Sequence, residues 1–480
     1  MPSAKKHKRQ PNPKIAVIND EVFDETIFNW SRTFAQVMDI AHKKHYAITD
    51  PKENMIKAID GFINSLDAHS SFLDPKSYQE ILEKTSGEFY GVGIVIDGTR
   101  TKDKHLTIVD TIPDGPADKA GIEPGDIIVE INDQKLEGMS TEKIISLLKG
   151  ERHSTVKVKI MRENNPALLS FDVVRDIVKE QHSLSFHIKS HNIAYISLTM
   201  FTDVAVKQIE ALLKKAHVQQ HKALILDLRN NSGGLLNAAI DIAGLFLKKN
   251  SLVTLTKDKH GKEIERYSTT RNPVSKNTLP IFILINNYTA SAGEILAGCL
   301  KINSDTTNNC LVFLVGTKTF GKGSVQEIIP ISNDCAIKIT TCLYFLPDNT
   351  TIQGTGIDPD FLIEQTSTLT EQVQWYIKNY GREEMLDNYI RVTKQGIPLV
   401  KDKDEKKDIP TKKKGSRRYD KAKDMLQNDN QLRDCIVLIS MLNTAQLYTP
   451  NLVKNRADAL TYLKQNYIGS DQLEIEEVTL

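Results

Sequence analysis

The sequence predicts an α+β chain of several domains, with an α/β core, an inserted β-rich module before it, and helical segments at both ends. Apolar residues recur at helical spacing near both ends, which predicts the helical segments. Short β-like runs separated by Gly and Pro follow the first of these segments, and after them continuous apolar strands alternate with helical stretches. With 480 residues, the chain is long enough for roughly two to four domains.

The composition excludes several classes of protein. Hydrophobic residues make up 40% of the chain and charged residues 26%, a globular balance, and the formal net charge of +1 argues against a dedicated nucleic-acid binder. The strongest apolar runs, residues 280–285 and 311–315, are strand-length and far shorter than the roughly 18 residues of a membrane helix. The five cysteines show no metal-ligand spacing. We therefore expect no transmembrane segment, no nucleic-acid partner, no metal and no cofactor.

The N-terminal part is expected to contain a tail and then helices. Residues 1–28 are basic, polar and interrupted by Pro, which predicts a disordered tail. Residues 29–85 are predicted to form a helical segment, because apolar residues such as Phe34, Val37 and Met38 recur at three- and four-residue spacing.

Residues 86–165 form the predicted β-rich module. Its one helix is expected to begin after Ser140, a good N-cap, and to end at Gly150. The expected strands include residues 92–96, 106–109, 126–131 and 156–160.

Residues 166–365 form the predicted α/β core. The runs 223–228 and 281–285 are continuously apolar, as expected for strands that are buried on both faces. Each is followed by a turn and then a helical pattern. After the core we expect a helical extension, a charged linker and a helical C-terminal segment, at residues 366–400, 401–418 and 419–480 respectively.

Two segments of the core place small residues directly after a buried strand. In residues 227–235, Gly233 and Gly234 allow close approach of a ligand to the backbone. In residues 286–295, Ser291 lies at a strand-to-helix junction, where helix N–H groups favour developing negative charge. The simpler alternative is that Thr289 or Ser291 only caps the helix.

A third segment, residues 316–326, nearly spells a phosphate-binding loop. Gly323 stands where that loop requires Ser or Thr, and a strand pattern follows where a helix is required, which argues against a nucleotide triphosphatase. Lys322 remains, and a desolvated lysine can serve as a general base, although a surface turn lysine is the simpler alternative. All twelve histidines lie at or before His260 and none lies in these three turns, so Lys322 is the better-placed base for a serine nucleophile.

Together these segments resemble the carboxyl-terminal processing (tail-specific) serine peptidases. The resemblance covers roughly residues 30–365, in the family's order of a helical segment, a PDZ module and a catalytic core. Its markers are residues 65–73, 87–94, 113–126, 227–235, 289–295, 316–326 and 353–360.

The resemblance implies a ClpP/crotonase-like peptidase core with a Ser-Lys-Gln mechanism. It assigns Ser291 as nucleophile, Lys322 as general base and Gln326 as the residue that orients the lysine. The implied oxyanion-hole candidates are the N–H groups of Gly233, Gly234 and Ala292.

For the PDZ module, the resemblance implies that it binds substrate C-termini. The peptide carboxylate is expected at a turn formed by Tyr90, Gly91, Val92 and Gly93. The expected function is thus a serine endopeptidase that recognises protein C-termini through its PDZ domain. A PDZ module that only packs against the core, an inactive PDZ scaffold that binds peptides, and an acyl-CoA hydratase-like enzyme are the alternatives.

Three features depart from the family's pattern, the first being that residues 347–352 lack the basic residue expected after the family's Pro-turn. Residues 302–310 are expected to form an extra polar loop between the Ser291 helix and the next strand. No apolar segment of a signal peptide follows the basic residues 5–9, although the resemblance implies a location outside the cytoplasm; a cytoplasmic location is expected if Met1 is the true start. The terminal helical segments, residues 30–82 and 419–470, suggest a homodimer.

Overall fold

The computed structural model describes residues 25–46, 50–86, 88–100, 106–112, 114–136, 139–162, 165, 167–179, 182–218, 221–274, 279–307, 311–365 and 429–467. The tail expected over residues 1–28 is wrong for residues 25–28, which belong to helix α1 (Glu25–Lys44), and its remainder lies outside the described residues. The helical extension and the charged linker also lie outside the described residues. The chain divides into two compact units. Of the described residues, unit 1 contains those within 25–80 and 325–341, and unit 2 contains those within 81–324, 342–365 and 429–467. No helix among the described residues is long and apolar enough to cross a membrane.

The predicted N-terminal helical segment is present, but a short strand interrupts it. Strand β1 pairs antiparallel with β18, with Ser71 opposite Lys338. Local periodicity did not predict this strand, because its partner lies more than 250 residues away in the chain. The elements are α1 (Glu25–Lys44), α2 (Pro51–Asn64), β1 (Ser71–Leu73), α3 (Pro75–Ser86), β17 (Ser324–Pro330) and β18 (Ala336–Phe345).

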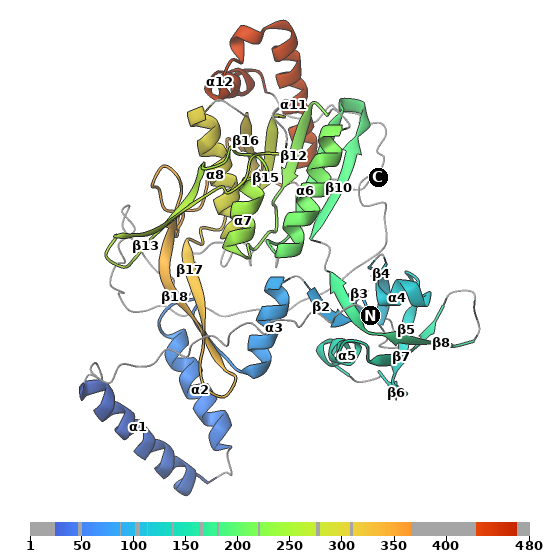
Figure 1. Cartoon of the computed structure of the whole chain (residues 1–480), viewed down its shortest axis with the longest axis vertical. Coiled ribbons are helices and arrows are strands. Elements are labelled where there is room, and N and C mark those ends of the chain that lie inside the picture. The colour runs from blue at the N-terminus through green and yellow to red at the C-terminus, as the bar shows by residue number, and fades with distance from the viewer. Residues whose placement is uncertain are drawn as a thin grey trace, which may run out of the picture. The chain divides into compact units, whose positions relative to one another are not determined.

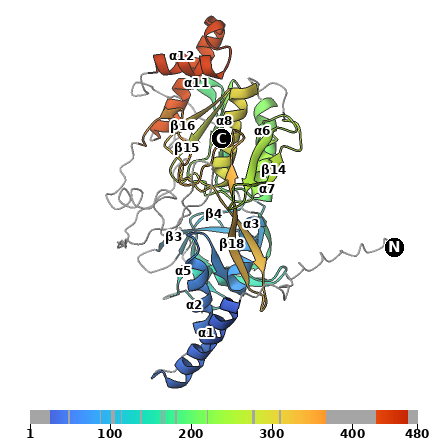
Figure 2. The same cartoon turned by 90° about the vertical axis from the view of Figure 1, so that its left-hand side faces the viewer.

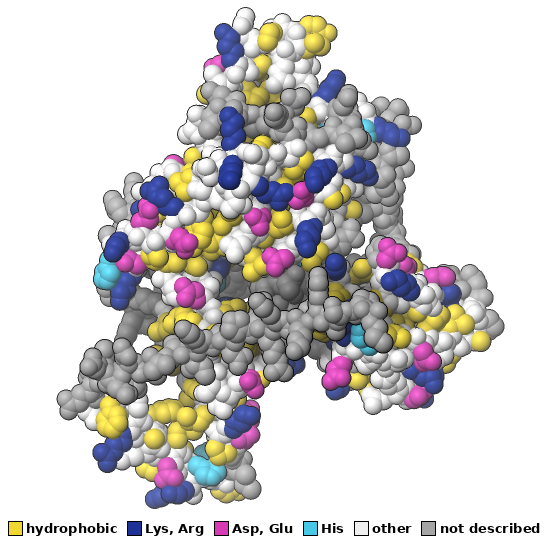
Figure 3. Space-filling view, viewed as in Figure 1, with side chains coloured by type: hydrophobic (Ala, Val, Ile, Leu, Met, Phe, Trp, Pro, Cys, Tyr) yellow, Lys and Arg dark blue, Asp and Glu magenta, His cyan; other side chains and the backbone are white. Residues whose placement is uncertain are grey.

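Helices α1 and α2 expose much of the apolar face that their sequence pattern predicts. Trp30 is 69% exposed and Phe62 is 64% exposed, whereas Ile63 is buried. Figure 3 shows apolar side chains on the surface of these two helices. Further exposed members are Ile27, Phe28, Phe34, Val37, Ile40 and Met55.

The β-rich module forms its own sheet in the strand order β3-β4-β5-β7-β8, with β6 paired to β5. The helix predicted from Ser140 is present as α5, and the Ser140 side chain accepts a hydrogen bond from the Lys143 N–H. The strand expected over residues 92–96 begins only at Ile94, because Val92 and Gly93 form a turn with φ +73° at Gly93. Strand β8 pairs with β7, so the sheet continues past the expected boundary at residue 165. The elements are β2 (Glu88–Gly91), β3 (Ile94–Arg100), β4 (Leu106–Thr111), α4 (Pro116–Ala120), β5 (Ile127–Ile131), β6 (Gln134–Lys135), α5 (Thr141–Leu148), β7 (Thr155–Met161), β8 (Leu169–Val174) and β9 (Asp176–Lys179).

The core contains a six-stranded sheet in the order β10-β11-β12-β15-β16-β19, parallel except for β10 (Figure 1). Every residue of β12, β15 and β16 is buried, which confirms the prediction from the continuous apolar runs. The strands are β10 (Ser183–Ile188), β11 (Ile193–Leu198), β12 (Ala223–Asp227), β15 (Ile281–Ile285), β16 (Val312–Gly316) and β19 (Phe361–Leu362). The helices between them are α6 (Asp203–Val218), α7 (Leu236–Ala243) and α8 (Ala292–Thr307), and β13 (Leu252–Lys257) and β14 (Glu263–Ser268) pair with each other, β13 also with β18.

The sequence predicts a polar loop over residues 302–310. This prediction is wrong for residues 302–307, which continue helix α8. Their polar side chains find partners in the helical conformation. Asn303 donates to the Cys299 carbonyl, and the buried Ser304 hydroxyl accepts from the Val312 N–H over 3.1 Å. Residues 308–310 lie outside the described residues.

The predicted C-terminal helices pack on the core sheet itself. Helix α11 (Asn430–Tyr448) lies on the opposite face of the sheet from α6 and α8 (Figure 2), and helix α12 (Arg456–Asn466) follows it, with Arg456 paired to Asp305 of α8. Leu432, Ile436 and Ile439 of α11 are fully buried in one cluster with Phe282 and Phe313 of the sheet. The apolar face of this segment is therefore covered within the same chain, unlike that of α1 and α2.

Candidate active site

Ser291 lies at the junction of β15 and α8, as the sequence predicts. It is 9% exposed and has φ +54°, a left-handed conformation that is rare for a residue with a side chain. A residue that only caps a helix normally has an extended backbone, so this geometry argues against the simple N-cap alternative. Such strained backbone is concentrated at functional sites.

Glu294 joins the Ser291 turn to the Lys322 loop. Its Oε2 accepts the N–H groups of Ser291 and Lys322, each over 2.9 Å. Its Oε1 accepts the Thr319 hydroxyl over 2.6 Å and the Gly321 N–H over 2.8 Å. One carboxylate thus receives four hydrogen bonds and fixes two segments that are distant in the chain.

The Glu294 carboxyl is fully buried. Burial raises its pKa to about 7, although each of the four hydrogen bonds acts in the opposite direction. The sequence pattern did not predict a role for Glu294. Its position three residues after Ser291, where a capping-box residue stands relative to an N-cap, is the signal that could have revealed it.

A second side chain holds the Lys322 loop from its other end. Oε1 of the buried Gln353 accepts the Gly323 N–H over 2.8 Å. The Gly321 carbonyl accepts the Gly354 N–H over 2.8 Å. The segment around residue 353, noted in the sequence only as a family marker, therefore clamps the loop that carries Lys322, whose side chain is half-buried.

The structure brings one oxyanion-hole candidate, Gly233, close to Ser291 and to the neighbouring candidate Ala292. A Cβ added to Gly233 would lie 2.8 Å from Cβ of Ser291 and 3.2 Å from the Ala292 nitrogen. The Gly233 N–H donates to Asn231 Oδ1 over 2.8 Å. Gly234 packs against the backbone of Phe201, and no acceptor for its N–H or for that of Ala292 occurs among the described residues.

Gln326 lies on β17, in unit 1, and is half-buried. Its Nε2 donates to the Thr340 hydroxyl over 3.1 Å.

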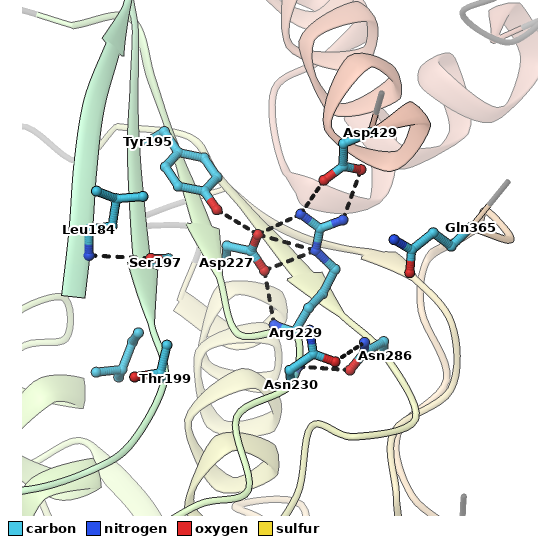
Figure 4. A pocket seen from close by; sticks show the side chains of 11 residues that line it. Leu184, Tyr195, Ser197, Thr199, Asp227, Arg229, Asn230, Asn286, Gln365 and Asp429 are labelled. Carbon is cyan, nitrogen blue, oxygen red and sulfur yellow. Dashed lines mark hydrogen bonds and ion pairs between the residues drawn. The ribbon is translucent and has the colours of Figure 1, made fainter. Parts of the chain in front are cut away.

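Arg229 anchors a buried polar cluster at the C-terminal end of β12 (Figure 4). Its guanidinium forms ion pairs of 2.6 Å with Asp227 and with Asp429, and Tyr195 donates to Asp227 over 2.7 Å. Burial lowers the pKa of Arg229, but the two carboxylates outweigh it and hold the pKa above its ordinary value. Local sequence patterns could not predict this cluster, because Asp429 lies 200 residues from Arg229 in the chain.

A cavity of about 270 Å³ lies beside this cluster. Figure 4 shows that Asn230 and Asn286, which are hydrogen-bonded to each other, form part of its wall. Among the described residues, no group of His, Cys, Asp and Glu is arranged to hold a metal ion.

The turn expected to bind peptide carboxylates has a fixed conformation. The Val92 carbonyl accepts the Ala117 N–H over 2.8 Å, and the Gly93 carbonyl accepts the Ile112 N–H over 2.9 Å. Tyr90 and Gly91 lie on β2, which pairs with β9, and the Tyr90 side chain is 48% exposed.

Comparison with known proteins identifies the family. Residues 192–363 match the model of peptidase family S41, and residues 107–162 match a PDZ domain model. The chain is 32% identical over 356 residues to the carboxy-terminal-processing protease of Bartonella bacilliformis, covering 73% of this chain and 79% of that protein. The chain belongs to peptidase family S41. It is a carboxy-terminal-processing serine peptidase with a PDZ domain, which confirms the resemblance and excludes the acyl-CoA hydratase-like alternative.

Other similar proteins carry related names. The carboxy-terminal processing protease CtpA of Bacillus subtilis is 30% identical over 353 residues, which cover 73% of this chain and 71% of that protein. The solved photosystem II D1 C-terminal processing protease matches with 24% sequence identity and a TM-score of 0.41, over 75% of this chain and 92% of that chain.

Proposed function

We propose that this S41 peptidase recognises the C-termini of protein substrates and cleaves them with Ser291 as nucleophile, Lys322 as general base and Gln326 as the residue that orients the lysine. The observation that carries the proposal is the shared attachment of Ser291 and Lys322 to Glu294. It fixes the backbone of both residues relative to one carboxylate, as a nucleophile and its base require.

In the proposed reaction, Ser291 Oγ attacks the peptide carbonyl carbon and its proton passes to the neutral amine of Lys322. The lysine then donates this proton to the nitrogen of the departing peptide. Water attacks the resulting acyl ester, with Lys322 again as base, and releases Ser291.

The oxyanion of the tetrahedral intermediates would be held by backbone N–H groups. We assign this role to Gly234 and Ala292, because the third candidate, Gly233, already donates its N–H to Asn231. A single donor of this kind lowers the barrier by about 2.7–4 kcal/mol. This arrangement is of the kind expected from a ClpP/crotonase-like core.

The PDZ module supplies the proposed recognition of C-termini. Strand β3 lies at the edge of its sheet, so a substrate C-terminus can add to it as a further strand. The carbonyls of Val92 and Gly93 are used within the fold. The turn of Tyr90, Gly91, Val92 and Gly93 is the proposed carboxylate site, and the amide groups of Val92 and Gly93, which lie outside the β2–β9 ladder, are its proposed donors.

The exposed face of α1 and α2 supports a homodimer. An apolar surface that contains Trp30, Phe34 and Phe62 is energetically unfavourable in water and is the kind of surface that a second copy of the chain would cover.

The decisive experiment combines cleavage with active-site labelling. Ser291→Ala and Lys322→Ala should each abolish cleavage of an unfolded protein with an apolar C-terminal tag. A fluorophosphonate should label Ser291 in the unchanged enzyme, as located by mass spectrometry, and label it far more slowly in Lys322→Ala. Ser146→Ala, an exposed serine of α5, is the matched control. Undiminished turnover by Ser291→Ala would refute the proposed mechanism.

The specificity claim has its own test. Amidation of the substrate's C-terminal carboxylate should raise KM and leave Ser291 labelling unchanged. Equal cleavage of the amidated and free forms would contradict recognition through the carboxylate.

A further inference from the structure

A chain of hydrogen-bonded side chains in unit 1 ends on Gln326. Gln326 Nε2 donates to Thr340 Oγ1 over 3.1 Å, and Thr340 Oγ1 donates to Asp67 Oδ1 over 3.1 Å. The Ser70 hydroxyl donates to Asp67 Oδ2 over 2.5 Å and accepts the Thr340 N–H over 3.1 Å. These residues come from the loop before β1, from β18 and from β17.

The pairing of β1 with β18 creates this arrangement. Ser71 lies opposite Lys338, so the loop of residues 67–70 lies next to Thr340. Asp67 and Ser70 are 6% and 2% exposed. Asp67 also accepts the N–H groups of His69 and Ser70, over 2.8 and 2.9 Å, which fixes the loop itself.

The network has a defined direction because Asp67 is ionised. Burial raises the pKa of its carboxyl, but the hydrogen bonds from Ser70, His69 and Thr340 outweigh burial and leave the pKa below its ordinary value. A carboxylate only accepts hydrogen bonds, so the single proton of the Thr340 hydroxyl points to Asp67. The Thr340 oxygen can therefore only accept a hydrogen bond from Gln326. The group of Gln326 that faces it must be the NH₂, because the amide oxygen cannot donate.

This direction fixes which way the Gln326 carboxamide points. Its nitrogen faces Thr340, and its oxygen consequently lies on the other side of the amide group. A lysine that acts as a base must direct its lone pair at the nucleophile, and its N–H groups then need acceptors. A glutamine that orients such a lysine must present oxygen, because a reversed amide would donate to the lone pair that the reaction needs.

We propose that Asp67 and Thr340 are positioning residues that set the polarity of the Gln326 carboxamide, so that it presents its oxygen as an acceptor for Lys322. The proposal rests on the proposed role of Gln326. It also gives a physical role to residues 65–73, which the sequence shows only as a family marker.

The test measures kcat and KM for the full-length enzyme with the tagged unfolded substrate. Thr340→Val keeps the side-chain shape but removes the hydroxyl, and should lower kcat roughly 10- to 100-fold with little change in KM. Thr340→Ser, which restores the hydroxyl, should retain most of the activity. Thr341→Val is the matched control, since Thr341 is exposed and its hydroxyl donates to Glu327.

A double-mutant cycle separates positioning from a general structural effect. Because Thr340 acts through Gln326, Thr340→Val should cause no further loss of kcat in a Gln326→Ala background. An additive loss in the double variant, or a Thr340→Val enzyme as active as Thr341→Val, would overturn the proposal. If Thr340→Val does not fold, Asp67→Asn takes its place in the cycle, because an asparagine can also donate and so no longer fixes the direction of the Thr340 proton.

Ser291→Ala distinguishes this proposal from the proposed function. If Ser291→Ala is inactive while Thr340→Val is unimpaired, only the positioning role fails. If Ser291→Ala remains active, the proposed mechanism itself fails, and with it the role of Gln326.

Discussion

Ser291 and Lys322 donate their backbone N–H groups to the same atom, Oε2 of Glu294, each over 2.9 Å. The two residues are 31 positions apart in the sequence and belong to different loops. Their relative backbone position therefore depends on one buried carboxylate. This makes Glu294 the first residue to change when the geometry of the proposed site is tested.

We expect Glu294→Gln to lower kcat at least 10²-fold with a smaller effect on KM. The amide nitrogen of Gln donates rather than accepts, so at least two of the N–H and O–H groups that now bind Glu294 lose their acceptor. Each buried donor left without an acceptor costs about 1–3 kcal/mol, so the loops should shift. Steady-state kinetics with the tagged substrate measure the effect.

Glu327→Gln is the control for this substitution, because Glu327 is exposed and lies on β17. It should leave kcat within about twofold of the original enzyme. A fully active Glu294→Gln enzyme would show that the shared carboxylate is not needed for the site.

The stability of the enzyme should depend on pH through Glu294. Its pKa is about 7 in the folded protein, against an ordinary value of 4.5. The folded state therefore holds a proton between these two pH values that the unfolded state releases. The resulting stabilisation, on the order of 3 kcal/mol, is complete below pH 4.5 and is lost as the pH rises through about 7.

Urea unfolding of the unchanged enzyme and of Glu294→Gln, each at pH 5, 6, 7 and 8, measures this contribution. The unfolding midpoint of the unchanged enzyme should fall relative to that of the variant as the pH rises. A difference between the two proteins that stays constant over this range would contradict the raised pKa.

Local features of the sequence predicted the elements that carry the proposed site. Strand β12 and strand β15 follow from continuous apolar runs, and the junction at Ser291 follows from the small residues between a strand and a helical pattern. Lys322 could be recognised as a candidate base because its segment resembles a phosphate-binding loop but has Gly323 where that loop requires Ser or Thr. These features are encoded within about ten consecutive residues.

Features that depend on residues distant in the chain were not predictable in this way. Glu294 acquires its role from the Lys322 loop, and Arg229 from Asp429. Strand β1 forms only because β18 is beside it. Periodicity identified the apolar faces of both terminal helical segments, but only the structure shows that α11 covers its own sheet while α1 leaves its face exposed.

Alanine at one glycine should reduce activity, and alanine at another should increase stability. Gly233 has φ +101°, and an added Cβ would lie 2.8 Å from Cβ of Ser291, so Gly233→Ala should displace Ser291 and lower kcat by at least tenfold.

Gly61 lies within α2 and an added Cβ would contact nothing within 4 Å, so Gly61→Ala should stabilise the helix by about 1 kcal/mol. Kinetics and thermal unfolding of the two variants provide the measurement, and an active Gly233→Ala enzyme would contradict the close approach.

Charge placed on the exposed face of α1 should separate the proposed homodimer. Trp30 and Phe34 are 69% and 42% exposed within the chain, so Trp30→Glu with Phe34→Glu should not disturb its fold. Sedimentation velocity should show a dimer for the unchanged enzyme and a monomer for the double variant. Arg32→Glu is the control for the added charge. A monomer in both cases would contradict the homodimer.

The Arg229 cluster should contribute strongly to stability, because Arg229 is the shared ion-pair partner of two poorly exposed carboxylates. The side chains of Arg229, Asp227 and Asp429 are only 7%, 7% and 12% exposed. Arg229→Met would leave the two carboxylates poorly solvated and without their partner, at a cost of about 3–5 kcal/mol. Asp429 also caps α11 by accepting the Leu432 N–H, so this helix should loosen first.

Arg266→Met is the comparison, because its ion pair with Glu263 is largely exposed and should contribute about 0–1 kcal/mol. Replacing both carboxylates as well, with Asp227→Asn and Asp429→Asn, should recover much of the stability lost in Arg229→Met, because no buried charge then remains without a partner. Urea unfolding of the four proteins distinguishes this electrostatic cause from loss of packing. If the triple variant is less stable than Arg229→Met alone, hydrogen bonding and packing by the two aspartates, rather than their unpaired charge, dominate the cluster.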